Sequence, residues 1–204
     1  SDAGEGHMSR PPTPRTPVEP ALAWPPELLL RAQGVRVAIF DVDGVLTDGG
    51  LYFGPEGEAL KRFHTLDGHG IKLLARAGIE PVVISGRDSA ALRQRLSGLG
   101  VRHLRLGTEA KLAAAEALLP ELGAGWHEVA AIGDDWPDLP LLARAAFTCA
   151  PPGAHAEALA LAQHQTRARG GEGAAREFCD LLLVASGRYR ALLDEALAAP
   201  GEAA

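Results

Sequence analysis

Short apolar, β-prone runs alternate with helical patterns along most of this chain. The runs cover residues 35–40, 81–84, 103–106, 129–132 and 147–149, and the helical patterns cover 70–76, 89–99, 111–122 and 139–145. Strands that read as continuous apolar runs are buried on both faces of a sheet. Their alternation with helices favours a parallel sheet with right-handed crossovers. We therefore predict an α/β fold with a Rossmann-like parallel sheet and flanking helices.

One segment, residues 51–63, departs from this alternation. It carries Gly54-Pro55-Glu56-Gly57 between two β-prone flanks. Glycine and proline at such spacing are typical of a tight turn between antiparallel strands. We predict a β-hairpin inserted after the first strand of the sheet.

The chain of 204 residues is long enough for one α/β domain, and its 47% hydrophobic content can fill a core. Residues 1–8 resemble a tag remnant, and residues 9–26 are rich in proline. Proline-rich segments resist regular structure. We predict a flexible arm over residues 1–27 and a single folded domain over residues 28–199.

The charge and cysteine content narrow the class of protein. A net charge of −6 argues against a nucleic-acid partner, which usually meets a basic surface. It leaves room for a small anionic substrate, which needs only a local group of lysine and arginine. No run approaches the roughly 18 apolar residues of a membrane span. The two cysteines have no metal-ligand or disulfide spacing, so we predict a cytoplasmic protein without a membrane partner.

Polar residues collect where the predicted strands end. The first strand is followed by Asp41 and Asp43, the second by Ser85, and the fourth by Asp134 and Asp135; the loop after the third leads to Lys111. In an open parallel sheet, ligands bind at the carboxyl ends of the strands. These side chains are therefore expected to face one crevice.

Such a set suits phosphate chemistry. Clustered carboxylates with no histidine or cysteine among them favour Mg²⁺, which neutralises phosphate charge. Asp41 can attack phosphorus and form an aspartyl-phosphate, and Asp43 can act as general acid and base. Ser85 and Lys111 can bind the phosphoryl oxygens, aided by the N–H groups of Val42, Gly44 and Gly86.

Each motif taken alone has an ordinary structural explanation. Asp-x-Asp is mostly found in turns, Ser85 could be a helix N-cap, and Lys111 could be a solvated helix residue. The order of the motifs, each placed after a predicted strand, is what favours a catalytic site.

Together these motifs resemble those of the haloacid dehalogenase superfamily of phosphotransferases. Residues 40–49 match its first motif, Ser85 the second, Lys111 the third and residues 133–138 the fourth. The resemblance implies that Asp41 is both nucleophile and Mg²⁺ ligand, that Asp43 binds the metal through its carbonyl, and that Asp134 is the third ligand. Asp135 and Asp138 would orient the site as supporting residues.

Residues 29–188 resemble the 3-deoxy-D-manno-octulosonate 8-phosphate phosphatase family more closely. The resemblance rests on Thr47-Asp48-Gly49, on the hairpin in place of a cap domain, and on residues 67–71 and 170–177. It implies a Mg-dependent hydrolase of lipopolysaccharide precursor biosynthesis, a homotetramer whose active sites are shared between neighbouring subunits. The sugar phosphate would be bound by Asp43, His64, Thr65, Leu66, Asp67, Gly68, Lys72, Gly86, Arg87, Arg95 and Lys111.

Two positions depart from that pattern. Some members have arginine where this chain has Leu66 and Glu172, and arginine would pair with a sugar carboxylate. A phosphatase for a nine-carbon, sialic acid-type sugar acid phosphate is therefore an alternative. A receiver-like signalling module would not need Asp43, and a non-catalytic assembly subunit would not need every motif residue.

Overall fold

The computed structural model describes residues 18–198, and the predicted α/β fold is confirmed. Six parallel strands form one sheet in the order β5-β4-β1-β6-β7-β8. Their bounds are β1 Val37–Phe40, β4 Glu80–Ser85, β5 His103–Leu106, β6 Val129–Ile132, β7 Phe147–Ala150 and β8 His164–Gln165. The strand order reverses beside β1, which pairs with β4 on one side and β6 on the other. A ligand crevice is expected at this point.

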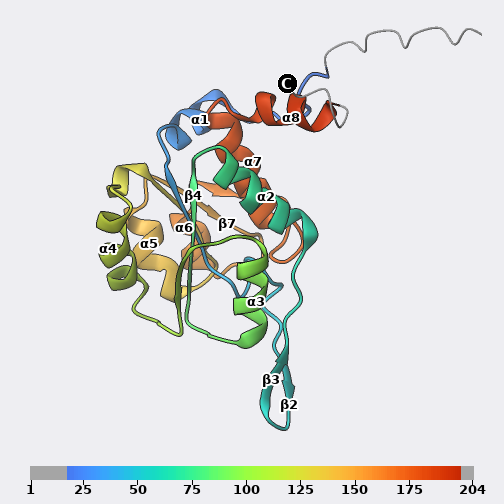
Figure 1. Ribbon diagram of the computed structural model, residues 1–204. Coiled ribbons are helices and arrows are strands. Elements are labelled where there is room, and N and C mark those ends of the chain that lie inside the picture. Colours follow the sequence, from blue (N-terminus) through green and yellow to red (C-terminus); the bar gives the residue numbers. More distant parts are fainter. Residues whose placement is uncertain (1–17, 199–204) are drawn as a thin grey trace, which may run out of the picture.

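Helices cover both faces of the sheet (Figure 1). Their bounds are α1 Pro26–Ala32, α2 Thr65–Arg76, α3 Ala90–Gly98, α4 Lys111–Glu121, α5 Leu139–Arg144, α6 Ala156–Leu161, α7 Ala174–Ala185 and α8 Tyr189–Leu197. Two single 3-10 turns, Trp126–Glu128 and Trp136–Asp138, flank β6. No helix in the described part of the chain is long and apolar enough to cross a membrane.

The pleat of β1 separates two hydrophobic cores. Ala38 and Phe40 belong to the core that holds the buried side chains of α2 and α7, where the Phe40 and Phe178 rings meet edge to face. Val37 and Ile39 belong to the core that holds those of α4 and α5. Because successive strand residues point to opposite faces, a fully apolar β1 is what a strand buried on both faces requires.

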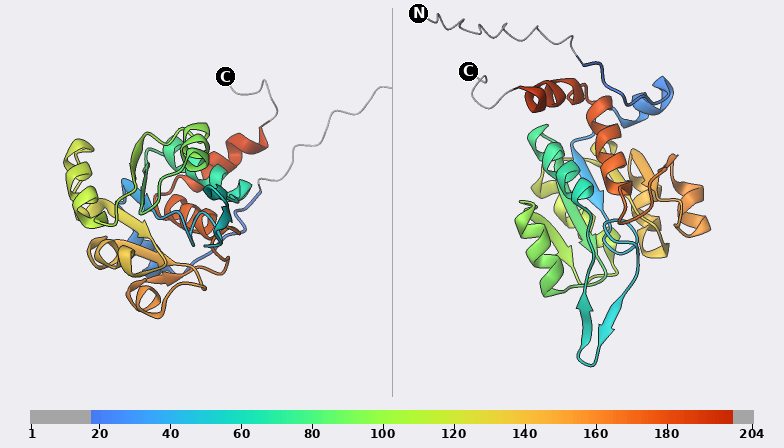
Figure 2. Two further views of the ribbon diagram at one scale, coloured as in Figure 1. Left: turned by 90° about the horizontal axis from the view of Figure 1, so that it is seen from below. Right: turned by 90° about the vertical axis from the view of Figure 1, so that its right-hand side faces the viewer.

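The predicted hairpin is present and consists of β2 (Tyr52–Gly54) and β3 (Gly57–Leu60). It projects away from the sheet, at the end of the molecule opposite α1 and α8 (Figures 1 and 2). Among its residues, Phe53 is 64% exposed and Leu60 is 66% exposed. The hairpin therefore buries little of its apolar surface within one chain.

The sequence analysis left the segment after β7 without predicted elements, and the structure finds α6, β8, α7 and α8 there. It also places the start of α2 at Thr65, five residues before the predicted start at Gly70. The predicted arm falls largely on residues 1–17, which lie outside the described residues.

Candidate active site

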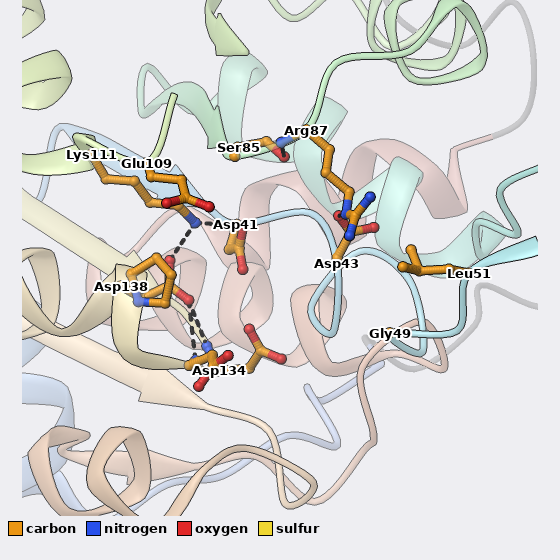
Figure 3. A pocket seen from close by; sticks show the side chains of 13 residues that line it. Asp41, Asp43, Gly49, Leu51, Ser85, Arg87, Glu109, Lys111, Asp134 and Asp138 are labelled. Carbon is orange, nitrogen blue, oxygen red and sulfur yellow. Dashed lines mark hydrogen bonds and ion pairs between the residues drawn. The ribbon is translucent and has the colours of Figure 1, made fainter. Parts of the chain in front are cut away.

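The carboxyl end of β1 opens into a cavity of about 560 Å³. Figure 3 shows Asp41, Asp43, Asp134 and Asp138 around it, together with Ser85 from the end of β4 and Lys111 from the start of α4. The residues that line the cavity are Asp41, Asp43, Gly49, Leu51, Ser85, Gly86, Arg87, Glu109, Lys111, Asp134, Asp135, Pro137 and Asp138. The structure thus brings together all of the residues that we predicted to be catalytic, metal-binding or supporting.

Lys111 ties two of the carboxylates together. Its Nζ donates to Oδ1 of Asp41 at 2.7 Å and to Oδ1 of Asp138 at 2.6 Å, and all three residues are buried. Burial alone would lower the pKa of Lys111, but the adjacent carboxylates outweigh it and raise that pKa. Lys111 therefore stays charged, beside the carboxylate of Asp41, the residue that we predicted to be the nucleophile.

Asp138 organises the loop after β6. Its Oδ2 accepts the N–H groups of Asp134 at 2.9 Å and of Asp135 at 3.3 Å. Together with the bond to Lys111, these contacts occupy both carboxylate oxygens of Asp138. Asp138 is thus better suited to orient Asp134 and Lys111 than to react or to bind a metal.

The donor set fits a hard divalent cation. Carboxylate oxygens of Asp41 and Asp134 lie within 4.8 Å of each other, and an oxygen of Asp138, which is occupied by its own hydrogen bonds, lies equally near and adds negative charge. Burial, and then the charge of Asp138, raise the pKa of Asp41 well above its usual range. Burial in the same cluster raises the pKa of Asp134 to about 6. The single ammonium group of Lys111 offsets only part of the negative charge of the three carboxylates. A divalent cation held by oxygen ligands would supply the remaining positive charge.

The loop after Asp41 is wound tightly by its own hydrogen bonds. The N–H groups of Gly44 and Gly49 both donate to Oγ1 of Thr47, at 3.3 and 3.2 Å. The N–H of Gly44, which we predicted to face a phosphate, is therefore already bonded. Gly44 instead gives room to Asp134, since a Cβ on Gly44 would lie 1.8 Å from Oδ2 of Asp134.

Ser85 is not a helix cap. Helix α3 begins at Ala90, and Ser89 is its N-cap, accepting the N–H of Leu92 at 3.2 Å. Ser85 is buried at the end of β4, where its Oγ accepts the N–H of Arg87 at 3.2 Å. This arrangement keeps the hydroxyl at the cavity wall.

The residues that we predicted to bind the sugar fall into two groups. Gly86 and Arg87 line the main cavity with Asp43 and Lys111. His64, Asp67, Gly68 and Arg95 line a separate, very small cavity between α2 and α3, while Thr65, Leu66 and Lys72 are exposed on α2.

Asp67 has a structural contact within the chain. Its Oδ1 accepts the N–H of Arg176 at 2.9 Å, which joins α2 to the start of α7. Burial raises the pKa of this carboxyl, and its Oδ2 is buried with no hydrogen-bond partner.

Three residues at the site were missed by the sequence analysis. Glu109 lines the cavity, Lys61 contacts Asp43 from the end of β3, and Glu58 of β3 lies 4.0 Å from Arg87. Charged residues on a hairpin usually indicate a solvated strand, so their spacing carried no signal for a catalytic role.

Curated relatives match most of the chain. The 3-deoxy-D-manno-octulosonate 8-phosphate phosphatase KdsC of Escherichia coli is 41% identical over 170 residues, which is 83% of this chain and 88% of the relative. This chain belongs to the 3-deoxy-D-manno-octulosonate 8-phosphate phosphatase family. No family model matches it.

Solved structures of the family agree with this assignment. A probable YrbI family phosphatase from Pseudomonas syringae superposes with a TM-score of 0.83 at 45% identity, covering 85% of this chain and 99% of that one. The Moraxella catarrhalis phosphatase, solved with a magnesium ion, a phosphate ion and KDO, has a TM-score of 0.80 at 35% identity, covering 83% and 98%. The family consists of phosphoric monoester hydrolases of the haloacid dehalogenase fold.

Proposed function

We propose that this chain is a Mg²⁺-dependent phosphatase that hydrolyses 3-deoxy-D-manno-octulosonate 8-phosphate to the free sugar acid and phosphate. The observation that carries the proposal is the meeting of Asp41, Asp43, Asp134 and Lys111 at the carboxyl end of β1. Family membership supports the choice of substrate.

The carboxylates of Asp41 and Asp134 and the backbone carbonyl of Asp43 would hold the magnesium ion. Bound there, the ion supplies positive charge that offsets the charge of the phosphate and of the cluster. Asp138 is left to position Lys111 and the Asp134 loop, in keeping with its three hydrogen bonds.

Catalysis would take place in two steps. An oxygen of Asp41 attacks phosphorus while the bond to the sugar oxygen breaks, and Asp43 gives its proton to that leaving oxygen. Asp43, now a carboxylate, then takes a proton from water as the water oxygen attacks the aspartyl-phosphate and frees Asp41. Ser85 and Lys111 bind the phosphoryl oxygens through both steps.

Selectivity for the sugar acid would come from two surfaces. Gly86 and Arg87 lie at the mouth of the same chain's cavity. We propose that residues 64–68, Lys72 and Arg95 also contact the sugar, and that they do so in a homotetramer whose active sites are shared between neighbours. These residues lie on or next to α2 and α3, outside the main cavity of their own chain. This position supports contact with a substrate bound at a neighbouring subunit's site.

The hairpin supports assembly as well. Leu51, Tyr52, Phe53 and Leu60 are exposed on it, and pairing of hairpins around a symmetry axis would bury them.

We place the enzyme in the cytoplasm, in lipopolysaccharide precursor biosynthesis. The two free, buried thiols, Cys149 and Cys179, suit a reducing compartment.

The test is phosphate release from a panel of sugar acid phosphates, with and without Mg²⁺, by the wild type and by Asp41→Asn. The eight-carbon substrate should give the highest kcat/KM. A higher kcat/KM for a nine-carbon sugar acid phosphate would reassign the substrate and point to Leu66 and Glu172 as the cause. No metal-dependent release from any of them would refute the proposed activity.

A further inference from the structure

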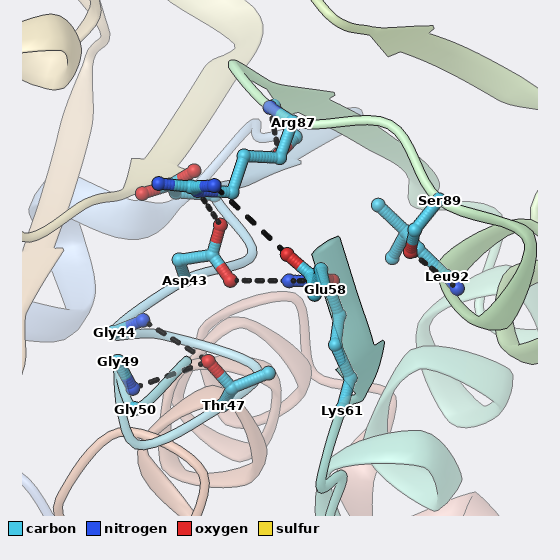
Figure 4. A network of polar contacts seen from close by, with 12 residues as sticks. Asp43, Gly44, Thr47, Gly49, Gly50, Glu58, Lys61, Arg87, Ser89 and Leu92 are labelled. Carbon is cyan, nitrogen blue, oxygen red and sulfur yellow. Dashed lines mark hydrogen bonds and ion pairs between the residues drawn. The ribbon is translucent and has the colours of Figure 1, made fainter. Parts of the chain in front are cut away.

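Each carboxylate oxygen of Asp43 faces its own cation (Figure 4). Nζ of Lys61 donates to Oδ1 at 2.7 Å, and Nε of Arg87 lies 3.6 Å from Oδ2. Lys61 directly follows β3, whereas Asp43 lies in the loop after β1. The base of the hairpin therefore reaches back to the cavity and contacts the side chain of Asp43.

The two cations are held differently. The Lys61 side chain is only 1% exposed, and its Nζ also lies 3.0 Å from Oε1 of Glu58, whose side chain is 14% exposed. An ammonium enclosed between two carboxylates has little freedom to move. The Arg87 side chain is 46% exposed, and its Nη1 is 4.0 Å from Glu58, so Arg87 can turn toward a ligand while Lys61 stays in place.

A general acid must present its proton to the leaving oxygen at hydrogen-bond distance. A carboxyl group that rotates freely about its χ2 bond presents either oxygen in many directions. The bond from Lys61 anchors Oδ1, which leaves Oδ2 as the oxygen that faces the cavity beside Arg87. Lys61 itself is sealed from the cavity and has no contact with the place where phosphate would bind.

We propose that Lys61 is a positioning residue for Asp43, and that Glu58 holds Lys61 in place for that role. The inference rests on the proposed function, in which Asp43 protonates the leaving oxygen. Lys61 transfers no proton: the proton passes from Asp43 to the leaving oxygen, and later from water to Asp43. The contribution of Lys61 is to fix which carboxylate oxygen of Asp43 carries the proton that is given to the leaving oxygen.

The role predicts a dependence on the leaving group. A sugar alkoxide is a poor leaving group and needs a proton from Asp43, whereas p-nitrophenolate leaves without one. kcat/KM reports only the steps up to departure of the leaving group, so Lys61→Met should lower kcat/KM for the sugar phosphate by roughly 10- to 100-fold, a part of the 10²- to 10⁴-fold that general acid catalysis supplies. kcat/KM for p-nitrophenyl phosphate should change by no more than about threefold, since p-nitrophenolate leaves without that proton, whereas kcat for either substrate also includes the second step, in which Asp43 acts as the base.

The experiment measures kcat and KM for both substrates, with Mg²⁺, in the wild type, Lys61→Met, Lys61→Arg and Asp43→Asn. Lys61→Arg should recover most of the sugar phosphate rate, because it keeps a cation on Oδ1. Asp43→Asn should show the same selectivity change, but larger. Arg62→Met is the matched control: Arg62 is the next residue, its side chain is 51% exposed, and its nearest acidic partner is Glu172 at 4.0 Å. It should match the wild type.

Lys61→Met removes the nearer of the two cations beside Glu58 and leaves only Arg87 at 4.0 Å, which costs stability. The double variant Glu58→Gln with Lys61→Met removes both charges and should fold, with Tm and sedimentation close to the wild type. Its sugar phosphate rate should remain low. Loss of folding in both variants would give Lys61 a structural role instead.

The proposal is overturned if, in a folded protein, Lys61→Met leaves the ratio of kcat/KM for the two substrates at its wild-type value. A wild type that releases phosphate from aryl phosphates but not from sugar acid phosphates would refute the proposed substrate only. In that case phenyl phosphate, which has the poorer leaving group, replaces the sugar phosphate, and the same comparison with p-nitrophenyl phosphate decides the role of Lys61.

Discussion

Gly170 packs against Gly44 so closely that a Cβ on Gly170 would lie 1.9 Å from the carbonyl oxygen of Gly44. The next residue, Gly171, has a φ of +69°, and its N–H donates to the carbonyl oxygen of Val45 at 2.9 Å. The loop before α7 thus supports the loop that carries Asp41 and Asp43. These contacts explain why glycine is required at positions far from the catalytic motifs in sequence.

Gly170→Ala should therefore destabilise the protein by about 2 kcal/mol or more, since the methyl group meets backbone that cannot move aside cheaply. It should also lower kcat for sugar and aryl phosphates alike, because the whole loop after β1 would shift. Urea unfolding and steady-state kinetics measure the two effects. Gly98→Ala is the control: it has no neighbour within 4 Å and lies in α3, and it should be neutral or slightly stabilising.

Asp41→Asn should abolish turnover of every phosphate ester. The amide is nearly the same shape as the carboxylate but is a poor nucleophile and a poor magnesium ligand. Circular dichroism should show an intact fold. Asp48→Asn, a change in the same loop on an exposed carboxylate that only accepts the N–H of Gly50, should keep wild-type activity. Normal phosphate release by Asp41→Asn would remove Asp41 from the chemistry.

Removal of the metal by a chelator should abolish phosphatase activity, and added Mg²⁺ should restore that activity. Ca²⁺ should bind but support little turnover, because it takes a larger and looser set of oxygen ligands. A readout independent of activity is Tm, which Mg²⁺ should raise in the wild type and not in Asp134→Asn, because binding to the native state stabilises it. Full activity in excess chelator would exclude the metal.

The loop before α7 also has a pH-sensitive anchor in Glu177. Burial alone would raise the pKa of Glu177, but hydrogen bonds from His164 Nε2 at 3.1 Å and from the N–H groups of Arg167 and Ala168 lower it. A carboxyl whose pKa is lower in the folded state stabilises the fold above its unfolded pKa, about 4.3, and loses that contribution as the pH falls through its folded pKa.

Glu177→Gln should accordingly reduce the free energy of unfolding most at pH 6 to 7. The difference from the wild type should shrink as the pH falls below about 4. Urea unfolding of both proteins across this range measures it, and the difference between them removes the titration of other groups. A difference that does not change with pH would show that the charge of Glu177 is not what anchors the loop.

The sequence predicted the sheet well because its signal is local. Strands β5 and β6 have the predicted bounds, since a glycine directly follows each of them and marks its end. The apolar run of β6 also reports its burial, whereas β5, which contains a histidine and an arginine, is only half-buried. Helix α7 was missed although its apolar residues gather on one face, so the signal was present in the sequence and was overlooked.

The site residues on the main sheet were predictable because parallel strands bring their carboxyl ends to one edge. The contacts that hold these site residues in place could not be predicted from the sequence. Asp138 could be placed in the site from its motif, but only the structure shows that it bonds Lys111 and two N–H groups at once. Lys61 lies on a hairpin outside the sheet, and no periodicity connects a hairpin residue to the loop after β1.

The hairpin provides the test of assembly. Without a cap domain, the cavity at β1 is open, and in the proposed assembly part of the selectivity would come from a neighbouring subunit. Tyr52 and Phe53 are exposed on β2, so changing both to glutamate should leave the isolated fold intact and break the proposed tetramer, because charges would be buried at the hairpin contact. Sedimentation measures the mass. Leu30→Glu makes a similar change on an exposed leucine of α1, at the opposite end of the molecule, and should leave the mass unchanged.

Kinetics on the same variants separate assembly from chemistry. If residues of one subunit complete the next subunit's site, the doubly substituted hairpin should lose at least 10-fold in kcat/KM for the sugar phosphate, the scale of one lost charged contact. It should keep most of its rate with p-nitrophenyl phosphate, which needs only the groups at the end of β1. A smaller particle with unchanged preference for the sugar phosphate would place recognition entirely within one chain, on Gly86, Arg87 and the other residues that line its own cavity.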